Sequence, residues 1–362
     1  MKRILAVVAG LLLLVAAYLL FWPVAVDPVA WQAPKDAGYI DPYASNNLLR
    51  PATAIDLGEF EGPEDAALGT DGLIYATTKN GAILQIRNRA VTEFARVEGR
   101  ALGIETDRDG SFVIANAYVG LQRISSDGSV TTLLDAVEGG PLVYANSLAI
   151  APDGMIYFSQ SSNKFGPGEF GGTYDASLLD ILEHGGHGSV FAFDPQTRDV
   201  ARIMSGLNYA NGVAVSDAGD FLVVAETGHY RVLKHWLNGE RRGETEILLD
   251  NLPGFPDNVK NGQNGRFWIG FAAPRNAIID KWSDKPALRR MIQRLPAAVR
   301  PKAEPLSHVI AINGDGDVLM NMHDPSARFP TITGVVETRD ALYLTTLFGN
   351  MLPRLAKGDI GR

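Results

Sequence analysis

The sequence predicts an all-β protein, a six-bladed β-propeller preceded by an N-terminal transmembrane helix. Three observations predict it: an uncharged apolar run at the N-terminus, a strand–turn–strand unit that recurs six times, and weak helical periodicity in the rest of the chain. A propeller blade takes about 40–50 residues, and the units recur at spacings of 38, 44, 65, 46 and 76 residues. A β-sandwich of six hairpins is the alternative, but a sandwich has no reason to repeat one hairpin at blade spacing.

The N-terminal run covers residues 4–22 and follows Lys2 and Arg3. About 19 apolar residues cover nearly the whole hydrocarbon core of a bilayer, about 30 Å thick. A cleavable signal peptide, the alternative, has a shorter apolar run and small residues at its cleavage site. The two basic residues should keep the N-terminus in the cytoplasm. We therefore expect residues 1–22 to be a cytoplasmic tip and a single-pass membrane anchor, with the body extracytoplasmic (periplasmic, lumenal or extracellular).

Composition divides the chain after residue 22 into two segments and excludes some classes of function. Residues 23–50 are rich in Pro, Ala, Asp and Asn and are predicted to be a tether. Trp22, at the end of the apolar run, and Trp31, further out in the tether, would suit a membrane interface. Residues 51–362 are predicted to form the propeller. The formal net charge of −8 argues against a nucleic-acid surface. The absence of cysteine excludes disulfides and thiolate metal sites.

Each repeated unit is a short strand, a tight turn and a second strand. Seven residues after the first aligned position comes a turn residue, and the next residue is Gly in five units, as in Asp-Gly hairpins. Insertions near 162–187 and 276–305 lengthen two of the spacings, and short helices are expected at 175–185 and 285–295. One interpretation is that these insertions wall a pocket, with apolar lining from Phe165, Phe170, Tyr174 and Trp282; the alternative is that these aromatics pack the insertions themselves.

The first aligned position of each unit, which we call the anchor, begins the innermost strand, so the anchors should converge near the propeller axis. Two carboxylates pushed together in a narrow channel repel or take up protons unless a cation lies there. Oxygen donors without His or Cys suit calcium. The alternative for the stretch FPDNV is a simple turn, since Pro, Asp and Asn are turn residues. The anchors are Glu64, Leu102, Asn146, Asn211, Asp257 and Thr333, and Asn258 lies beside one of them.

The stretches GPED, GRALGI, NSLAIAPDGMIYFSQSS, VVAETGHYRVLKHWL and LPGFPDNV resemble the strictosidine synthase-like proteins, including the adipocyte plasma membrane-associated group. More distantly, the chain is similar to paraoxonases, gluconolactonases and diisopropyl fluorophosphatase. The resemblance implies an axial calcium and hydrolysis of lactones, aryl esters or phosphotriesters, with Asp257 as the base. The calcium ligands that it implies are Glu64, Asn146, Asn211, Asp257 and Asn258.

Two anchors depart from these relatives. Leu102 stands where paraoxonases have a catalytic His, and Thr333 stands where strictosidine synthases have a catalytic Glu, with Glu337 further along the strand. Strictosidine synthesis is therefore not expected. One hypothesis is a membrane-anchored, calcium-dependent hydrolase of small esters or lactones, in which Asp257 is the base or nucleophile. The other is a non-catalytic propeller, stabilised by calcium, that binds a small molecule or a protein partner.

Overall fold

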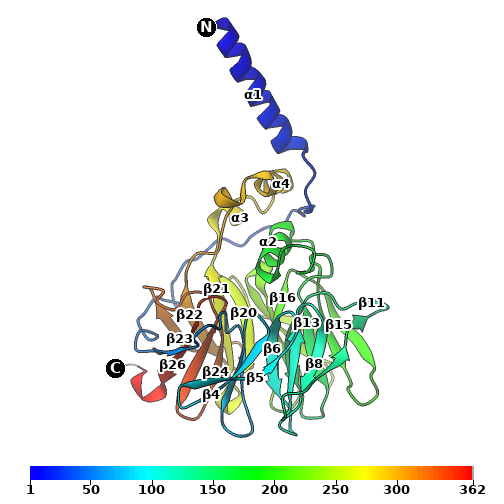
Figure 1. Ribbon diagram of the computed structural model, residues 1–362, viewed down its shortest axis with the longest axis vertical. Coiled ribbons are helices and arrows are strands. Elements are labelled where there is room, and N and C mark those ends of the chain that lie inside the picture. The colour runs from blue at the N-terminus through cyan, green and yellow to red at the C-terminus, as the bar shows by residue number, and fades with distance from the viewer. Residues whose placement is uncertain (361–362) are drawn as a thin grey trace.

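Residues 1–360 are described by a computed structural model, in which six four-stranded antiparallel sheets surround a central axis (Figure 1). In each sheet the four strands lie side by side in chain order, apart from the last sheet. The first three blades contain β2 (Ala66–Leu68), β3 (Ile74–Thr77), β4 (Ala82–Arg87) and β5 (Ala90–Arg96); β6 (Ala101–Thr106), β7 (Phe112–Asn116), β8 (Gly120–Ile124) and β9 (Val130–Leu134); and β12 (Ala145–Ile150), β13 (Ile156–Gln160), β14 (Gly188–Phe193) and β15 (Val200–Leu207).

The sixth blade is completed by the strand that comes first in the body, β1, which pairs antiparallel with the last strand, β26. This pairing closes the ring. The remaining blades contain β16 (Ala210–Val215), β17 (Phe221–Glu226), β18 (Arg231–Trp236) and β19 (Thr245–Leu249); β20 (Gly254–Asn261), β21 (Phe267–Pro274), β22 (Ser307–Ile312) and β23 (Val318–Asp324); and β24 (Ile332–Glu337), β25 (Ala341–Thr346), β26 (Met351–Ala356) and β1 (Thr53–Asp56). A small hairpin, β10 (Ala136–Val137) and β11 (Gly140–Pro141), lies outside the blades.

The inner strands β2, β6, β12, β16, β20 and β24 form a closed ring in which each contacts the next. Between the blades, apolar side chains from facing sheets pack into buried clusters. One such cluster joins Val223 and Val232 of blade 4 to Val259 and Ile269 of blade 5. The predicted six-bladed propeller is confirmed. Four anchors are the second residue of their inner strand, whereas Glu64 precedes β2 by two residues and Asp257 is the fourth residue of β20.

The antiparallel order of the strands decides which loops surround the site. The tight turns after the inner strands lie at one end of the ring; Gly154 in one of them has φ +92°, which favours glycine. The connection between the second and third strands therefore returns to the end at which the inner strands begin. Both insertions occur in this connection. They contain α2 (Thr173–Glu183) in blade 3, and α3 (Ala277–Lys281), α4 (Pro286–Arg294) and the 3₁₀ turn η3 (Ala297–Val299) in blade 5.

Before the propeller, α1 (Lys2–Phe21) projects from the face that carries α2, α3 and α4 (Figure 1). Among the described residues it is the one helix long and apolar enough to cross a membrane. Residues 23–50 run along the propeller, where Val26 and Leu49 are buried. Trp31, for which a membrane interface was the expectation, instead packs against the body of the protein. It stacks on His184 at 3.9 Å between ring centroids, because the tether packs against the C-terminal end of α2.

Candidate calcium site and cavity on the propeller axis

Five inner strands are irregular at their anchors. An irregularity of this kind turns the strand and re-aims a side chain, in this case towards the axis. FPDNV is therefore part of β20 rather than a simple turn, and its Asp-Asn pair sits where the strand is bulged. The pairing with the second strand shifts across Leu102, Asn146, Asn211, Thr333 and the pair Asp257–Asn258.

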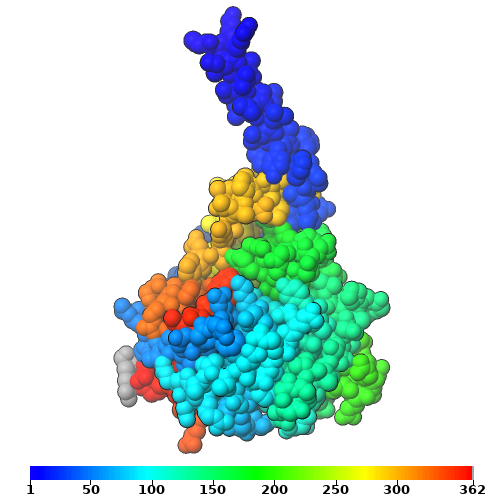
Figure 2. All heavy atoms as spheres, viewed as in Figure 1, coloured from blue at the N-terminus to red at the C-terminus, as the bar shows by residue number. Residues whose placement is uncertain are grey.

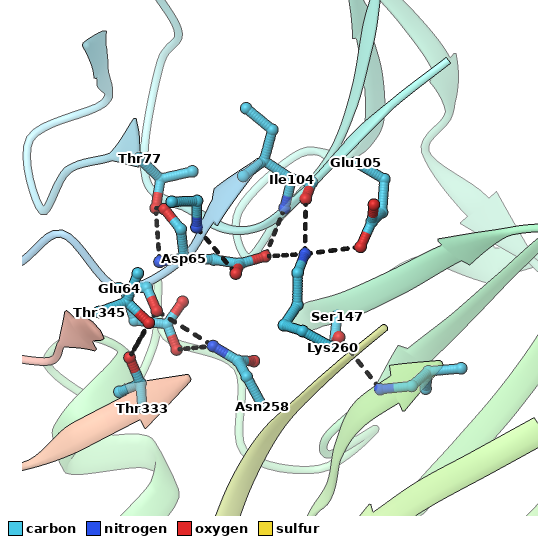
Figure 3. Close-up of polar contacts among 12 residues, drawn as sticks. Glu64, Asp65, Thr77, Ile104, Glu105, Ser147, Asn258, Lys260, Thr333 and Thr345 are labelled. Atoms are coloured by element: carbon cyan, nitrogen blue, oxygen red, sulfur yellow. Dashed lines mark hydrogen bonds and ion pairs between the residues drawn. The ribbon is translucent and has the colours of Figure 1, made fainter. Parts of the chain in front are cut away.

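Three carboxamides from three blades hold the same arrangement at the axis. Asn146 Nδ2 donates to Ser161 Oγ at 2.7 Å, and Asn211 Nδ2 donates to Asp257 Oδ1 at 2.6 Å. Asn258 Nδ2 donates to the carbonyl of Glu64 at 3.0 Å (Figure 3). Each amide thus uses its N–H groups in hydrogen bonds within the protein. Each Oδ1 is left buried without a hydrogen-bond donor.

The two carboxylates complete the cluster. Glu64 is 3% exposed, and its Oε2 is also buried without a partner. Burial, followed by the charge of Asp257, raises the pKa of Glu64 well above its ordinary value. Burial likewise raises the pKa of Asp257 to about 7, although the hydrogen bond from Asn211 opposes this. The protein alone therefore holds negative charge poorly at this point.

These observations fit a hard cation. Buried oxygens without donors are rare in folded proteins, and four of them here belong to the predicted ligands Glu64, Asn146, Asn211 and Asn258. Calcium accepts carboxylate and amide oxygens together. Within residues 1–360 no three His, Asp or Glu side chains form a metal cluster, so an ion here must use the amides as well. The five predicted ligands come from blades 1, 3, 4 and 5, and hydrogen bonds join Glu64 to Asn258 and Asn211 to Asp257.

A second tier of residues, two positions before the anchors, was missed by the sequence reasoning. Tyr144 and Tyr209 precede Asn146 and Asn211 in the repeated tripeptide YAN, which the aligned repeats contain. Their φ angles are +64° and +62°, a strained conformation that costs about 1–3 kcal/mol and collects at functional sites. Their hydroxyls lie 2.6 Å apart, and Tyr144 also donates to the carbonyl of Thr173 in α2. Burial raises the pKa of both, so both are neutral donors.

Below the anchors, a buried ion cluster joins blade 5 to blades 1 and 2 (Figure 3). Lys260 Nζ donates to Asp65 Oδ2 at 3.0 Å, to Glu105 Oε1 at 2.6 Å and to the carbonyl of Ile104 at 2.8 Å. Burial would lower the pKa of Lys260, but the two carboxylates raise it above its ordinary value. The cluster connects the strand that carries Asp257 to the residue next to Glu64. It therefore positions two of the predicted ligands.

A cavity of about 390 Å³ lies over the axial residues, and its floor includes Glu64, Asn146, Asn211 and Asp257. Both insertions wall it, as predicted. Its walls are mostly apolar and come from α2, from Phe255 of β20 and from the segment after α4. Of the four expected aromatics, Phe170 and Tyr174 line the cavity, whereas Phe165 and Trp282 pack instead in an apolar cluster with Leu179 and Ile292.

Solved structures with the same architecture include a gluconolactonase from Xanthomonas campestris, with a TM-score of 0.61, 17% identity, and coverage of 84% of this chain and 88% of that one. They also include regucalcin from Agrobacterium tumefaciens, a calcium-binding protein, with a TM-score of 0.56, 12% identity, and coverage of 84% and 92%. At these identities the likeness establishes the fold.

Comparison of the sequence with known families and proteins identifies the family as well as the fold. The strictosidine synthase family model matches residues 146–240, and the model of the N-terminal region of strictosidine synthase-like proteins matches residues 41–86. An adipocyte plasma membrane-associated protein from Salmo salar is 30% identical over 346 residues, which is 88% of this chain and 80% of the relative. The chain belongs to the strictosidine synthase-like family, together with the adipocyte plasma membrane-associated proteins.

Proposed function

We propose that this protein is a membrane-anchored, calcium-dependent hydrolase of small esters or lactones. One observation carries the proposal: the floor of a largely apolar cavity holds two carboxylates and two amides, the amide of Asn258 is buried beside Glu64, and four oxygens of these five residues are buried without donors. Glu64, Asn146, Asn211, Asp257 and Asn258 would hold the calcium. When bound, calcium would polarise the carbonyl of a substrate above it. In the proposed topology α1 spans the membrane, with the N-terminus in the cytoplasm and the propeller extracytoplasmic.

The chain's own groups suit this reaction. Asp257 Oδ1 is fixed by Asn211, while Asp257 also faces the cavity, where it can take a proton from an attacking water. The water oxygen bonds to the carbonyl carbon, the ester C–O bond breaks, and the leaving oxygen regains the proton. Tyr144 donates its hydroxyl proton to the carbonyl of Thr173. Tyr209 is therefore the member of the pair whose hydroxyl can turn and donate to a substrate oxygen. The apolar walls exclude water from the acyl and alcohol groups.

A second candidate is a propeller that binds a ligand without turning it over. Leu102 favours it, because this cavity residue is apolar and can activate no water. In this case the axial ion would only hold the blades together. Asp257 would be a ligand and nothing more.

The experiment is a panel of lactones, aryl acetates and phosphotriesters, assayed with and without a chelator on the purified full-length protein in detergent. The hydrolase predicts turnover of at least one ester or lactone, lost with the chelator and restored by calcium. Turnover of none of them by folded, calcium-loaded protein would reject the hydrolase in favour of the binding propeller.

A further inference from the structure

Residues 277–305, which we call the lid segment, lie between the cavity and the N-terminal helix. Ile279, Ile292 and Ala303 of this segment line the cavity. On the other side of the segment, α4 contacts α1. Figures 1 and 2 show the segment, coloured gold, between the propeller and the blue helix. The roof of the cavity is therefore also the part of the body nearest the proposed membrane anchor.

The lid segment is attached to the end of α1 itself. Arg294 Nε donates to the carbonyl of Trp22 at 2.6 Å, and its Nη1 donates to the carbonyl of Leu19 at 2.8 Å. Carbonyls in the last turn of a helix have no partner within the helix, so Arg294 caps α1. An apolar helix that crosses a bilayer ends at the level of the lipid headgroups. The capping contact places α4 at that level.

Two further arginines hold the chain that leaves α1. Arg290 forms an ion pair with Asp27. The buried Arg289 donates to the carbonyls of Val29 and, at 2.9 Å, of Leu182 at the end of α2. The lid segment is thus bound to the anchor, to the tether and to the opposite wall of the cavity. Side-chain contacts therefore fix the position of the lid segment relative to the end of α1.

The outer surface of the lid segment combines basic and apolar groups. Counted over all of its residues, the lid segment contains seven Lys and Arg, of which Arg289 and Arg294 are buried, against three Asp and Glu; this is a net charge of +4 in a chain whose net charge is −8. Residues 296–299 are four consecutive exposed apolar residues, and Val299 is 64% exposed. An exposed apolar run is unfavourable in water unless it serves contact with another surface. Basic residues around an apolar surface are typical of segments that lie in the membrane interface.

We propose that the lid segment docks on the lipid surface from which α1 emerges, with residues 296–299 among the headgroups. The same loop supplies Ala297, Arg300 and Ala303 to the cavity wall, so the cavity opens beside the bilayer. This inference rests on the membrane anchor of the proposed function. It adds that the substrate is a lipophilic ester or lactone taken from the membrane.

Because the chain has no cysteine, single cysteines can report contact with lipid. Leu12→Cys, Val299→Cys and Leu319→Cys, each in the full chain, are labelled with bimane and reconstituted in phosphatidylcholine–phosphatidylserine vesicles. The vesicles contain lipids with a nitroxide at the headgroup or on the acyl chain. Leu12 reports insertion of α1. Leu319 is 51% exposed in β23, near the end of blade 5 opposite the lid segment, and is the matched control.

The proposal predicts quenching of the label at position 12 by the acyl-chain nitroxide and at position 299 by the headgroup nitroxide. The label at position 319 should keep its full fluorescence. Quenching at position 12 with none at position 299 would overturn the proposal while leaving the anchor intact. An unquenched label at position 12 would overturn the proposal together with the anchor.

Hydrolysis gives a separate measurement of the ligand class. With vesicles present, Val299→Asp should lower the rate on membrane-dissolved 4-nitrophenyl decanoate several-fold and leave the rate on aqueous 4-nitrophenyl acetate unchanged. Leu319→Asp should change neither rate. Equal losses on both esters would count against delivery from the membrane. If the wild type turns over neither ester, the proposed hydrolase fails on these substrates, and the quenching result still decides whether the lid segment touches lipid.

Discussion

Asn211 and Asp257, from adjacent blades, are joined by a hydrogen bond of 2.6 Å from the amide Nδ2 to the carboxylate Oδ1. The bond aligns both side chains at the floor of the cavity and leaves Asn211 Oδ1 without a donor. The hydrogen bond from the amide lowers the pKa of Asp257, against the effect of burial, and so favours the ionised form of the carboxylate. Burial nevertheless raises the pKa of Asp257 to about 7, so the hydrogen bond from Asn211 only partly offsets the cost of ionising this carboxylate.

Asp257→Asn separates the roles of Asp257 as calcium ligand and as general base. Asn is nearly isosteric and can still give one oxygen to calcium, but it cannot act as a base at neutral pH. If Asp257 is the base, turnover should fall by about 10²–10⁴-fold at saturating calcium while the variant stays folded. The measurement is turnover against calcium concentration for wild type and variant. Full recovery at high calcium would contradict the base role.

Calcium should stabilise the folded protein. A ligand that binds only the native state adds about 2.7 kcal/mol when its free concentration is about 100 times Kd. Thermal unfolding with calcium and with a chelator measures the gain. Glu64→Ala should abolish it because it removes a carboxylate ligand, whereas Asp315→Ala, on an exposed turn, should keep it. If calcium raised the melting temperature of Glu64→Ala as much as that of the wild type, the assignment of Glu64 as a calcium ligand would be wrong.

The increase in melting temperature that calcium causes should depend on pH. Burial raises the pKa of Asp257 to about 7 in the metal-free protein, so the folded state binds a proton that the unfolded state has already lost. This contribution to stability is complete below the unfolded pKa and is lost as pH rises through about 7. Calcium replaces that proton, so its thermal shift should be larger at about pH 8 than at about pH 5. Equal shifts would argue that calcium binds elsewhere.

Lys260→Met tests the ion cluster below the site. It leaves Asp65, 1% exposed, and Glu105 without their buried cation. Removing one partner of a buried pair costs about 3–5 kcal/mol, and urea unfolding should show a loss of this size. Lys79→Met, at an exposed position, should change the unfolding free energy by no more than about 0.5 kcal/mol. A loss below about 1 kcal/mol for Lys260→Met would mean that the cluster does not hold the blades.

Tyr209→Phe removes a hydroxyl from the cavity without changing its shape. If Tyr209 donates to the substrate oxygen as charge develops there, kcat should fall by about 10²-fold with little change in KM. Tyr343→Phe, in β25 and outside the cavity lining, is the control and should keep full activity. An unchanged kcat for Tyr209→Phe would leave the tyrosine pair a purely structural role.

The propeller was predictable because its signal is repeated. Each hairpin alone is weak, but six in one register define the blades, and the same register brings Glu64, Asn146 and Asn211 to the axis. Two of the six units also have a Tyr two residues before the anchor, in the tripeptide YAN, but two occurrences are too few to mark these tyrosines as part of the repeat. The short α3 was not predicted, since its five residues depend on the capping side chain of Asn276 rather than on apolar periodicity.

Other parts of the site could not be predicted from local pattern. Lys260 and Asp65 are 195 residues apart, and nothing in either neighbourhood specifies the other. The bulges that aim the anchors arise from pairing with the second strand, which is a property of the folded sheet. The bonds of Arg294 to the end of α1 join residues 272 and 275 positions apart. Such contacts follow from ring closure rather than from composition.

The pairing of β1 with β26 determines where this protein can be cut. A protease that cleaves between Trp22 and Thr53 would leave β1 on the propeller, so the released propeller would keep a closed ring and its axial residues. Cleavage after Asp56 would remove the outer strand of the sixth blade and expose the edge of β26. Cleavage just before Thr53 and cleavage just after Asp56 would therefore give a closed ring and a fragment with an exposed strand edge, although the two products differ by only a few residues at the N-terminus.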